Sequence, residues 1–261
     1  MSALELLTVA AAAVVAGALA LWVVSLRRRD ASLVDRFWGP GFVLVAALGA
    51  VAGAGPLARK VLVFVLVAIW GLRLGWHIHR RNRGQGEDPR YVAMRAHHGE
   101  AFGRVSLFTV FLLQAAILLV VALPLVAAAS ATEPATLGAL DLLATLVWLG
   151  GFLFEAVGDA QLARFKADPA NRGRVMDRGL WRYTRHPNYF GDATLWWGLF
   201  LFAAATGAWW TAVGPALMTL LLVRVSGVVL LEKGLAASKP GYAAYVARTS
   251  AFLPRPPRAA R

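Results

Sequence analysis

The sequence contains no cysteine, so disulfide bonds, thiolate metal ligands and cysteine nucleophiles are all excluded. Acidic residues are scarce as well: 14 Asp and Glu stand against 27 Lys and Arg, which gives a formal net charge of +13. Such an excess could indicate a nucleic-acid partner, but the basic residues stand beside apolar runs and do not form a soluble basic face. We therefore expect no nucleic acid among the partners.

Charged residues of both signs make up only 16% of the chain, whereas hydrophobic residues make up 59%. Runs of about 20 apolar residues separate the charged clusters, which is the length needed to cross roughly 30 Å of hydrocarbon. This pattern predicts an all-α membrane protein in which residues 1–261 form a single membrane domain. About seven transmembrane helices are expected, near residues 3–26, 38–55, 57–76, 105–129, 137–158, 189–205 and 209–231.

The loops between these spans alternate in charge. Glu133 and Asp141 mark one side, whereas Arg59 and Lys60, near the tip of a tight hairpin between the second and third spans, are the exceptions to the pattern. The positive-inside rule then places the N-terminus outside and the C-terminus in the cytoplasm. No basic residue precedes the first apolar run, so it is interpreted as a retained span. The basic segments are 27–36, 80–104, 164–185 and the tail 239–261. We expect the tail to lie at the level of the cytoplasmic headgroups.

The densest polar stretch, residues 179–198, lies where the chain re-enters the bilayer. Polar side chains are costly at that depth, which favours a function for them. Pro187 suits the first position of a helix, so the free backbone N–H groups and the positive dipole end should form an anion site. Asn188 and Asp192 are four residues apart and share one face of that helix. The structural alternative is that Asp192 pairs with Arg185 or another inner Arg and joins two helices.

The preceding span ends with Glu155 and Asp159, again four residues apart, and the loop after it is rich in Arg. Carboxylates on a helix face can accept hydrogen bonds from ribose hydroxyls or a carboxamide, and the planar forks of Arg suit phosphates. This region therefore has the groups that a dinucleotide needs. Equally, Arg residues in an inner loop can serve only to set the orientation of the chain.

Two further polar groups flank the first three spans. His77 and His79 are two residues apart, so on a helix they point about 200° away from each other and do not easily ligate one metal ion. We expect no metal site. Asp35 precedes Phe37 and Trp38 at the cytoplasmic mouth of the second span, where a helix cap would also explain a carboxylate.

The segment GLWRYTRHPNYFGD, residues 179–192, resembles the membrane steroid 5-alpha-reductase and sterol reductase families. The segments DRFWG and NRGQGEDPRY look like an uncharacterised bacterial family related to them, and the likeness covers nearly the whole chain. The core R-H-P-x-Y-x-G is also similar to isoprenylcysteine and phospholipid N-methyltransferases, which share the C-terminal helical arrangement but use S-adenosylmethionine. The motif thus identifies a superfamily better than a cofactor.

The reductase resemblance implies NADPH as the cofactor. Asn188 and Asp192 match an Asn and an acid that contact NADPH in those enzymes. Asp159 and Arg174 match further contacts, and Glu232 looks like an acid near the last cofactor-facing segment. The full set of expected cofactor-binding residues is Arg80, Arg83, Asp159, Arg174, Arg182, Tyr183, Arg185, His186, Asn188, Tyr189, Asp192 and Glu232.

Catalysis is expected from Asp35, His77 and Tyr91. His77 stands at the position aligned with the catalytic Tyr of the reductase family, and Tyr91 lies in the stretch that follows that span. Steroid 5-alpha-reductases polarise the enone with a Gln-Glu pair, whereas this chain offers only Asp35 in a comparable place. The resemblance therefore does not imply steroid specificity.

The reaction implied is the NADPH-dependent reduction of a C=C bond in a steroid-, isoprenoid- or fatty-acyl-like substrate, in the inner membrane of a bacterium. An acid near Asp35 or His77 would stabilise the developing enolate. The alternative is a methyltransferase dependent on S-adenosylmethionine, but that cofactor has no phosphate for the Arg-rich loops. A transporter or assembly factor would need a polar path through the bilayer, which the Leu, Val and Ala of the outer half-spans do not favour.

Overall fold

The computed structural model describes residues 1–225, 232 and 239–258. Within these residues every regular element is a helix, and one isolated parallel bridge joins Thr184 to Ser250. The all-α prediction is therefore confirmed. Two compact units divide the chain: the first comprises Met1–Leu140 and Phe202–Gly214, and the second comprises Asp141–Leu201 and Pro215–Arg261. The single membrane domain over residues 1–261 stays a prediction, and parts of two predicted segments, 226–231 and 259–261, lie outside the described residues.

Among the described residues, five helices are long and apolar enough to cross a membrane. Helices of this length and composition are typical of a multi-pass membrane protein, and their number is two fewer than the sequence predicts. The sixth and seventh predicted spans correspond to the helix Pro187–Ala204 and to the shorter apolar helix Trp209–Val225. The five spans are Ala3–Arg28, Leu33–Ala52, Leu57–Asn82, Pro89–Val121 and Ala139–Ala167.

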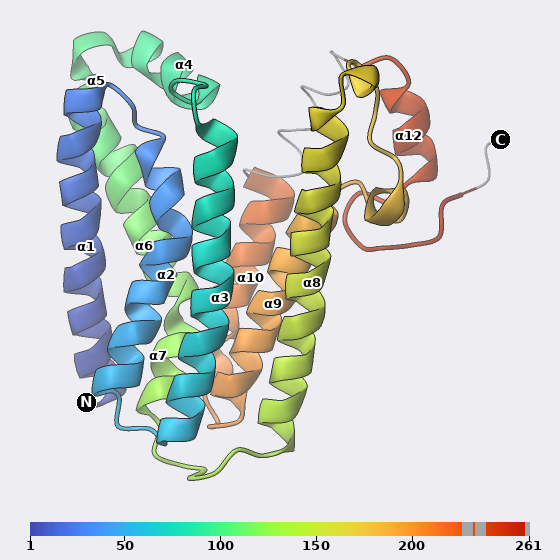
Figure 1. The fold of residues 1–261 in the computed structure, drawn as a ribbon. Coiled ribbons are helices and arrows are strands. Elements are labelled where there is room, and N and C mark those ends of the chain that lie inside the picture. The colour runs from blue at the N-terminus through green and yellow to red at the C-terminus, as the bar shows by residue number, and fades with distance from the viewer. Residues whose placement is uncertain (226–231, 233–238, 259–261) are drawn as a thin grey trace. The chain divides into compact units, whose positions relative to one another are not determined.

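The first unit is a bundle of long helices that run up and down (Figure 1). Its interior is filled by large side chains that are fully buried, among them Phe42, Trp70, Phe111 and Leu118. The fourth long helix is interrupted by a π-helical turn and is assembled from consecutive segments. The elements in chain order are α1 (Ala3–Arg28), α2 (Leu33–Ala52), α3 (Leu57–Asn82), α4 (Pro89–His98), α5 (Phe102–Ser106), the π-helical turn Leu107–Leu112, α6 (Leu113–Val121) and α7 (Leu123–Ser130).

Helices α2 and α3 approach each other at a pair of glycines. A Cβ atom on Gly39 would lie 2.2 Å from the carbonyl oxygen of Gly71, and one on Gly71 would lie 2.7 Å from the carbonyl oxygen of Gly39. Helix α2 begins at Leu33, earlier than the predicted start at residue 38, and Pro40 lies inside it. Hydropathy marks where apolar residues start, whereas the hydrogen-bonded helix continues through its polar first turn. Asp35 therefore lies within α2 and does not precede it as a cap.

Arg59 and Lys60, the exceptions to the charge pattern, hold one end of the first unit together. The predicted hairpin is confirmed, because α2 ends at Ala52 and α3 begins at Leu57. Arg59 is 1% exposed, and its two Nη atoms donate to the carbonyl oxygens of residues 134 and 136 at 2.9 and 3.1 Å. The Nζ of Lys60 donates to the carbonyl oxygen of Gly53 at 2.7 Å. These bonds give both cations a structural role at this end.

In the second unit, α8 (Ala139–Ala167) and α9 (Pro187–Ala204) pack along a seam of glycines. A Cβ atom on Gly151 would lie 2.4 Å from the backbone nitrogen of Leu195, and one on Gly191 would lie 2.4 Å from that of Glu155. Only glycine allows two helix backbones to come this close. The predicted helix start at Pro187 is confirmed, and the seam brings the polar end of α8 against the first turn of α9.

The C-terminal tail folds back on the loop between α8 and α9. The backbone nitrogen of Arg185 donates to the carbonyl oxygen of Ser250 at 2.8 Å, and that of Arg255 donates to Tyr183 at 3.0 Å. The hydroxyl of Tyr245 donates to the carbonyl oxygen of Trp181 at 2.6 Å, and burial raises the pKa of this phenol. The second unit also contains most of α10 (Val213–Leu220), the π-helical turn Leu221–Val225 and α12 (Tyr242–Arg248).

Candidate functional site

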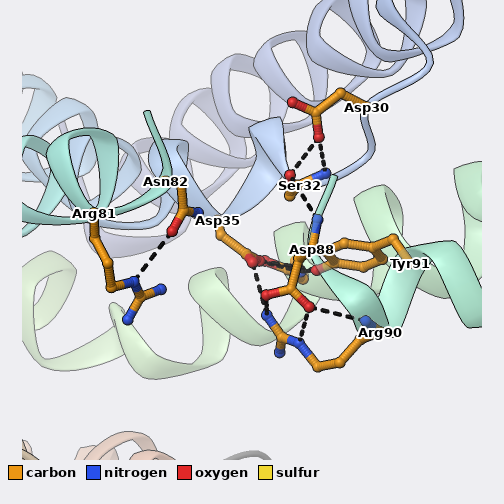
Figure 2. Close-up of polar contacts among 9 residues, drawn as sticks. Asp30, Ser32, Asp35, Arg81, Asn82, Asp88, Arg90 and Tyr91 are labelled. Atoms are coloured by element: carbon orange, nitrogen blue, oxygen red, sulfur yellow. Dashed lines mark hydrogen bonds and ion pairs between the residues drawn. The ribbon is translucent and has the colours of Figure 1, made fainter. Parts of the chain in front are cut away.

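A polar cluster joins α2 to α4 at one end of the first unit (Figure 2). The carboxylate of Asp35 accepts hydrogen bonds from the hydroxyl of Tyr91 at 2.8 Å and from Nη2 of Arg90 at 2.9 Å. Tyr91 is only 6% exposed, so its hydroxyl meets Asp35 away from bulk solvent. Arg90 also donates through Nε to Asp88 at 2.9 Å. The structure thus brings together two of the three expected catalytic residues, Asp35 and Tyr91.

The local sequence explains why Tyr91 lies there. Gly86 has a φ of +75°, which favours glycine and turns the chain out of the end of α3. Asp88 then caps α4 by accepting a hydrogen bond from the backbone N–H of Arg90 at 2.9 Å, and Pro89 occupies the first helical position. The cap fixes where α4 begins, and Tyr91 is consequently held over the first turn of α2.

Glu87 ties the same turn to the end of α1. Its carboxylate accepts hydrogen bonds from the backbone N–H of Ala31 at 2.7 Å and from Arg95 at 2.8 and 3.0 Å. Burial raises the pKa of Glu87, but the hydrogen bonds from Arg95 and Ala31 outweigh burial and hold the pKa below its usual range. Glu87 is therefore ionised at neutral pH, and it holds the turn beside the Asp35–Tyr91 pair in place.

Gln114, which the sequence analysis missed, completes the cluster. Its Nε2 donates to the hydroxyl of Tyr91 at 3.2 Å, and it lies 3.5 Å from the carboxylate of Asp35. It follows the π-helical turn Leu107–Leu112, a feature found frequently at functional sites. A lone amide in the long apolar run 105–129 was the signal that could have found it, because an amide is costly in hydrocarbon.

Gln114 also lines a small apolar pocket inside the first unit. The other walls are aliphatic and aromatic side chains, including Phe37, Trp38 and Phe111. The cavity volume is about 10 Å³, which is room for one water molecule at most. The polar cluster therefore borders an apolar interior that is closed in this conformation.

The remaining expected residues of the first unit lie on α3. His77 is in the last two turns of this helix, and its catalytic role stays a prediction. Arg80 and Arg83 are exposed at the end of α3. These two arginines belong to the first unit, whereas the other expected cofactor-binding residues all belong to the second.

In the second unit, Arg185, His186 and Glu232 form a buried network. Arg185 is 8% exposed, and its Nε and Nη2 donate to the two carboxylate oxygens of Glu232 at 2.8 and 3.0 Å. Its Nη1 donates to the carbonyl oxygens of Val246 and Thr249. The guanidinium N–H groups of Arg185 are therefore bonded to acceptors of the protein itself. These bonds connect the tail to the start of α9.

His186 extends this network. The ring is 3% exposed, its Nε2 lies 3.1 Å from a carboxylate oxygen of Glu232, and the ring of Tyr189 stacks on it with centroids 5.5 Å apart. Burial lowers the pKa of His186, and this effect outweighs the opposing effect of Glu232. His186 is thus neutral at pH 7, with the Nε2–H donating to Glu232.

Asp159 and Asn188 meet between the last turns of α8 and the first turn of α9. The Nδ2 of Asn188 donates to Asp159 at 3.1 Å. The Oδ1 of Asn188 is buried and accepts no hydrogen bond from any residue that the structure describes. Leaving such an acceptor unpaired costs about 1–3 kcal/mol. Glu155 and Asp192, buried on the same two helices, make further interactions nearby.

The other expected cofactor residues of the second unit lie on the loop and at the start of α9. Arg174, Arg182 and Tyr183 are exposed, and Tyr189 is half-buried. The carbonyl oxygen of Arg174 accepts a hydrogen bond from Lys239 at 2.6 Å, which ties the loop to the tail. Their binding roles stay predictions.

Comparisons with known proteins give two matches. Residues 21–249 match the model of a family described as "Protein of unknown function (DUF1295)". The chain is also 27% identical to an uncharacterised protein of Schizosaccharomyces pombe over 263 residues, which covers 90% of this chain and 76% of that protein. No solved structure matches the chain.

Proposed function

This chain belongs to the DUF1295 family of proteins of unknown function, and we propose that it is a membrane-embedded, NADPH-dependent reductase of a C=C bond in a lipophilic substrate. The observation that carries the proposal is the Tyr91–Asp35 pair, a buried acid on the border of an apolar interior. The proposal includes steroid-, isoprenoid- and fatty-acyl-like substrates. The steroid 5-alpha-reductase-like relationship is part of the same proposal.

The reduction of a C=C bond needs a hydride and a proton, and the nicotinamide supplies the hydride when it is bound. Tyr91 is the proposed proton donor, because its hydroxyl is held between the carboxylate of Asp35 and the amide of Gln114. The amide can also donate to a carbonyl oxygen on which negative charge develops. Arg90 holds Asp35, whose side chain is 16% exposed, so that a proton can return from solvent to Tyr91 through this carboxylate.

The cofactor fits the donor and acceptor set of the second unit. Asn188 presents a buried acceptor that a carboxamide N–H would satisfy, and Asp159 beside it can accept a ribose hydroxyl. Arg174 and Arg182 are exposed and can reach phosphates. In this proposal Arg185, His186 and Glu232 act mainly by holding the tail against the start of α9, because their polar groups already bond to one another.

We also propose seven spans, with the N-terminus outside and the C-terminus in the cytoplasm, in the inner membrane of a bacterium. The charge distribution within the first unit supports the orientation. Arg27, Arg36 and Arg83 lie at the ends of helices that meet near the polar cluster, whereas Arg59 and Lys60 at the other end are bound to carbonyl oxygens.

The test is ligand-induced stabilisation of the purified full-length protein in a neutral detergent. NADPH at 100 times its Kd should stabilise the wild-type protein by about 2.7 kcal/mol, which appears as an increase in Tm. Asn188→Ala should lose this increase because it removes the free acceptor. Tyr91→Phe should keep it, because Tyr91 is proposed to handle the proton and not the cofactor.

Two results would contradict the proposal. An increase in Tm with S-adenosylmethionine and none with NADPH would favour the methyltransferase alternative. An NADPH response of wild-type size in Asn188→Ala would mean that the Asp159–Asn188 pair is only structural. Circular dichroism of each variant checks that membrane helices are retained.

A further inference from the structure

An open cleft of about 690 Å³ lies between the loop after α8 and the C-terminal tail of the second unit. Volumes of this size are typical of small-molecule sites. Its charged lining consists of Asp177, Arg178 and Arg182 from the loop and Arg248 and Arg258 from the tail. Four guanidinium groups against one carboxylate leave a formal excess of three positive charges. Of these residues, the sequence analysis singled out only Arg182 as a site residue.

The positive charge of the cleft is mostly uncompensated. Asp177 forms an ion pair with Arg248. Arg178, Arg182 and Arg258 are exposed, and none of them pairs with a carboxylate in the part of the chain that the structure describes. Arginines that serve only to orient a membrane protein need not converge, yet these come from two segments about 70 residues apart in sequence.

Both walls of the cleft are held by hydrogen bonds. The backbone nitrogen of Arg258 donates to the carbonyl oxygen of Arg248 at 2.9 Å, which closes the tail into a loop. The indole N–H of Trp181 donates to the carbonyl oxygen of Gly158 at 3.0 Å, which fixes the loop wall to α8. The hydroxyl of Thr184 donates to the carbonyl oxygen of Phe252 at 2.8 Å, which fixes the same wall to the tail. The guanidinium groups are therefore carried on a defined backbone, which lowers the entropic cost of binding a ligand.

We infer that this cleft binds a phosphate group of a small anionic ligand. Phosphate oxygens accept several N–H bonds at once, and the planar fork of Arg matches them in pairs. The same chemistry is offered by a soluble nucleotide and by the headgroup of an anionic phospholipid. The inference shares Arg182 with the proposed cofactor site, but it needs neither the Tyr91–Asp35 pair nor the Asp159–Asn188 pair.

The experiment is calorimetric titration of the purified full-length protein in a neutral detergent at low salt. The probes are NADP⁺, dihexanoyl phosphatidylglycerol and, as the zwitterionic control, dihexanoyl phosphatidylcholine. The variant is Arg178→Gln/Arg182→Gln, and the matched control is Arg27→Gln/Arg28→Gln, which removes the same charge from exposed positions at the end of α1.

We expect saturable binding of at least one anionic probe, weaker at high salt because screening acts on exposed charges. Its Kd should rise at least about tenfold in Arg178→Gln/Arg182→Gln, since the variant removes two of the charged donors that would bond to phosphate oxygens. The control variant should change the Kd less than about twofold, and phosphatidylcholine should not saturate. Saturation by NADP⁺ alone identifies a nucleotide site, and saturation by phosphatidylglycerol alone identifies a lipid site.

Two outcomes would overturn the inference: no saturable binding of either anionic probe, or an equal rise in Kd for the variant and its control. The reductase is tested separately. If Asn188→Ala abolishes NADP⁺ binding, Arg178→Gln/Arg182→Gln leaves it intact and phosphatidylglycerol does not bind, the cleft inference fails. The reductase then stands on the Asp159–Asn188 pair, without Arg182 as a phosphate contact. If phosphatidylglycerol binds in the cleft and NADP⁺ binds nowhere, the reductase fails and the cleft stands.

Discussion

The seam between α8 and α9 predicts that Gly191→Ala destabilises the second unit. The added Cβ would lie 2.4 Å from the backbone nitrogen of Glu155 and 2.6 Å from the carbonyl oxygen of Gly151. Both neighbours are backbone atoms of α8, so no side-chain rotation can relieve the overlap. The two helices must separate, or α9 must rotate and carry Asn188 away from Asp159.

The geometry sets the size of the effect. An ordinary contact begins at about 3.4 Å, so the backbones must part by roughly 1 Å, a gap that forfeits a quarter to a half of each dispersion contact across the seam. Overpacking of this kind typically costs about 1–3 kcal/mol. Alanine is the better helix former by about 1 kcal/mol, which offsets part of the cost. We expect a net destabilisation of up to about 2 kcal/mol for Gly191→Ala.

Gly150 on α8 provides a matched control, because a Cβ there would have nothing within 4 Å. Gly150→Ala should leave the stability unchanged or raise it by up to about 1 kcal/mol. The free energy of unfolding of both variants is measured in mixed detergent micelles by tryptophan fluorescence. Equal stabilities for Gly191→Ala and Gly150→Ala would refute the argument that close backbone approach at the seam requires glycine.

Two further predictions concern the first unit. Arg59→Met should lower the free energy of unfolding by about 3 kcal/mol. The charged hydrogen bonds from Arg59 to two carbonyl oxygens are each worth roughly 1.5–3 kcal/mol. An unchanged stability would mean that this buried cation does not hold the α7–α8 connection. Arg95→Gln should destabilise the protein at pH 7, and the difference in Tm from wild type should shrink as the pH falls towards about 4. The pKa of Glu87 is below its usual range in the folded protein. The ion pair with Arg95 therefore stabilises the folded protein while Glu87 is ionised, and this stabilisation is lost as Glu87 is protonated at low pH. A difference in Tm that is constant with pH would contradict this.

Local sequence signals were sufficient for several elements of the site. Pro187 predicted the start of α9 because its fixed φ and missing N–H suit a first helical position. The α2–α3 hairpin followed from the few residues around Gly53, Gly55 and Pro56 between two apolar runs. Residues predicted separately then met across helices: Asp35 with Tyr91, and Asp159 with Asn188.

Other features depended on contacts between helices that the local sequence does not specify. Gln114 contributes through its contact with Tyr91, which depends on how α6 packs against α2 and α4 and on the π-helical turn before it. Arg185 was expected to bind the cofactor; its guanidinium bonds to Glu232 and the tail, because the tail folds back on the loop. The number of apolar helices that meet the length and composition of a span, five among the described residues, also falls short of the predicted seven.

The sequence alone determined the class of this protein: apolar runs long enough to cross hydrocarbon require helices, because a helix satisfies its own backbone hydrogen bonds in the absence of water. Only the tertiary structure decided which polar groups meet. The Asp35–Tyr91–Gln114 cluster joins residues from α2, α4 and α6, and its formation depends on how these helices pack. The arginine cleft joins the loop after α8 to the tail, and it depends on the hydrogen bonds that fold the tail back. A glycine in a sequence indicates where the backbone is free to adopt unusual conformations or to be approached closely. Which residue of another helix packs against that glycine depends on the packing of the whole bundle.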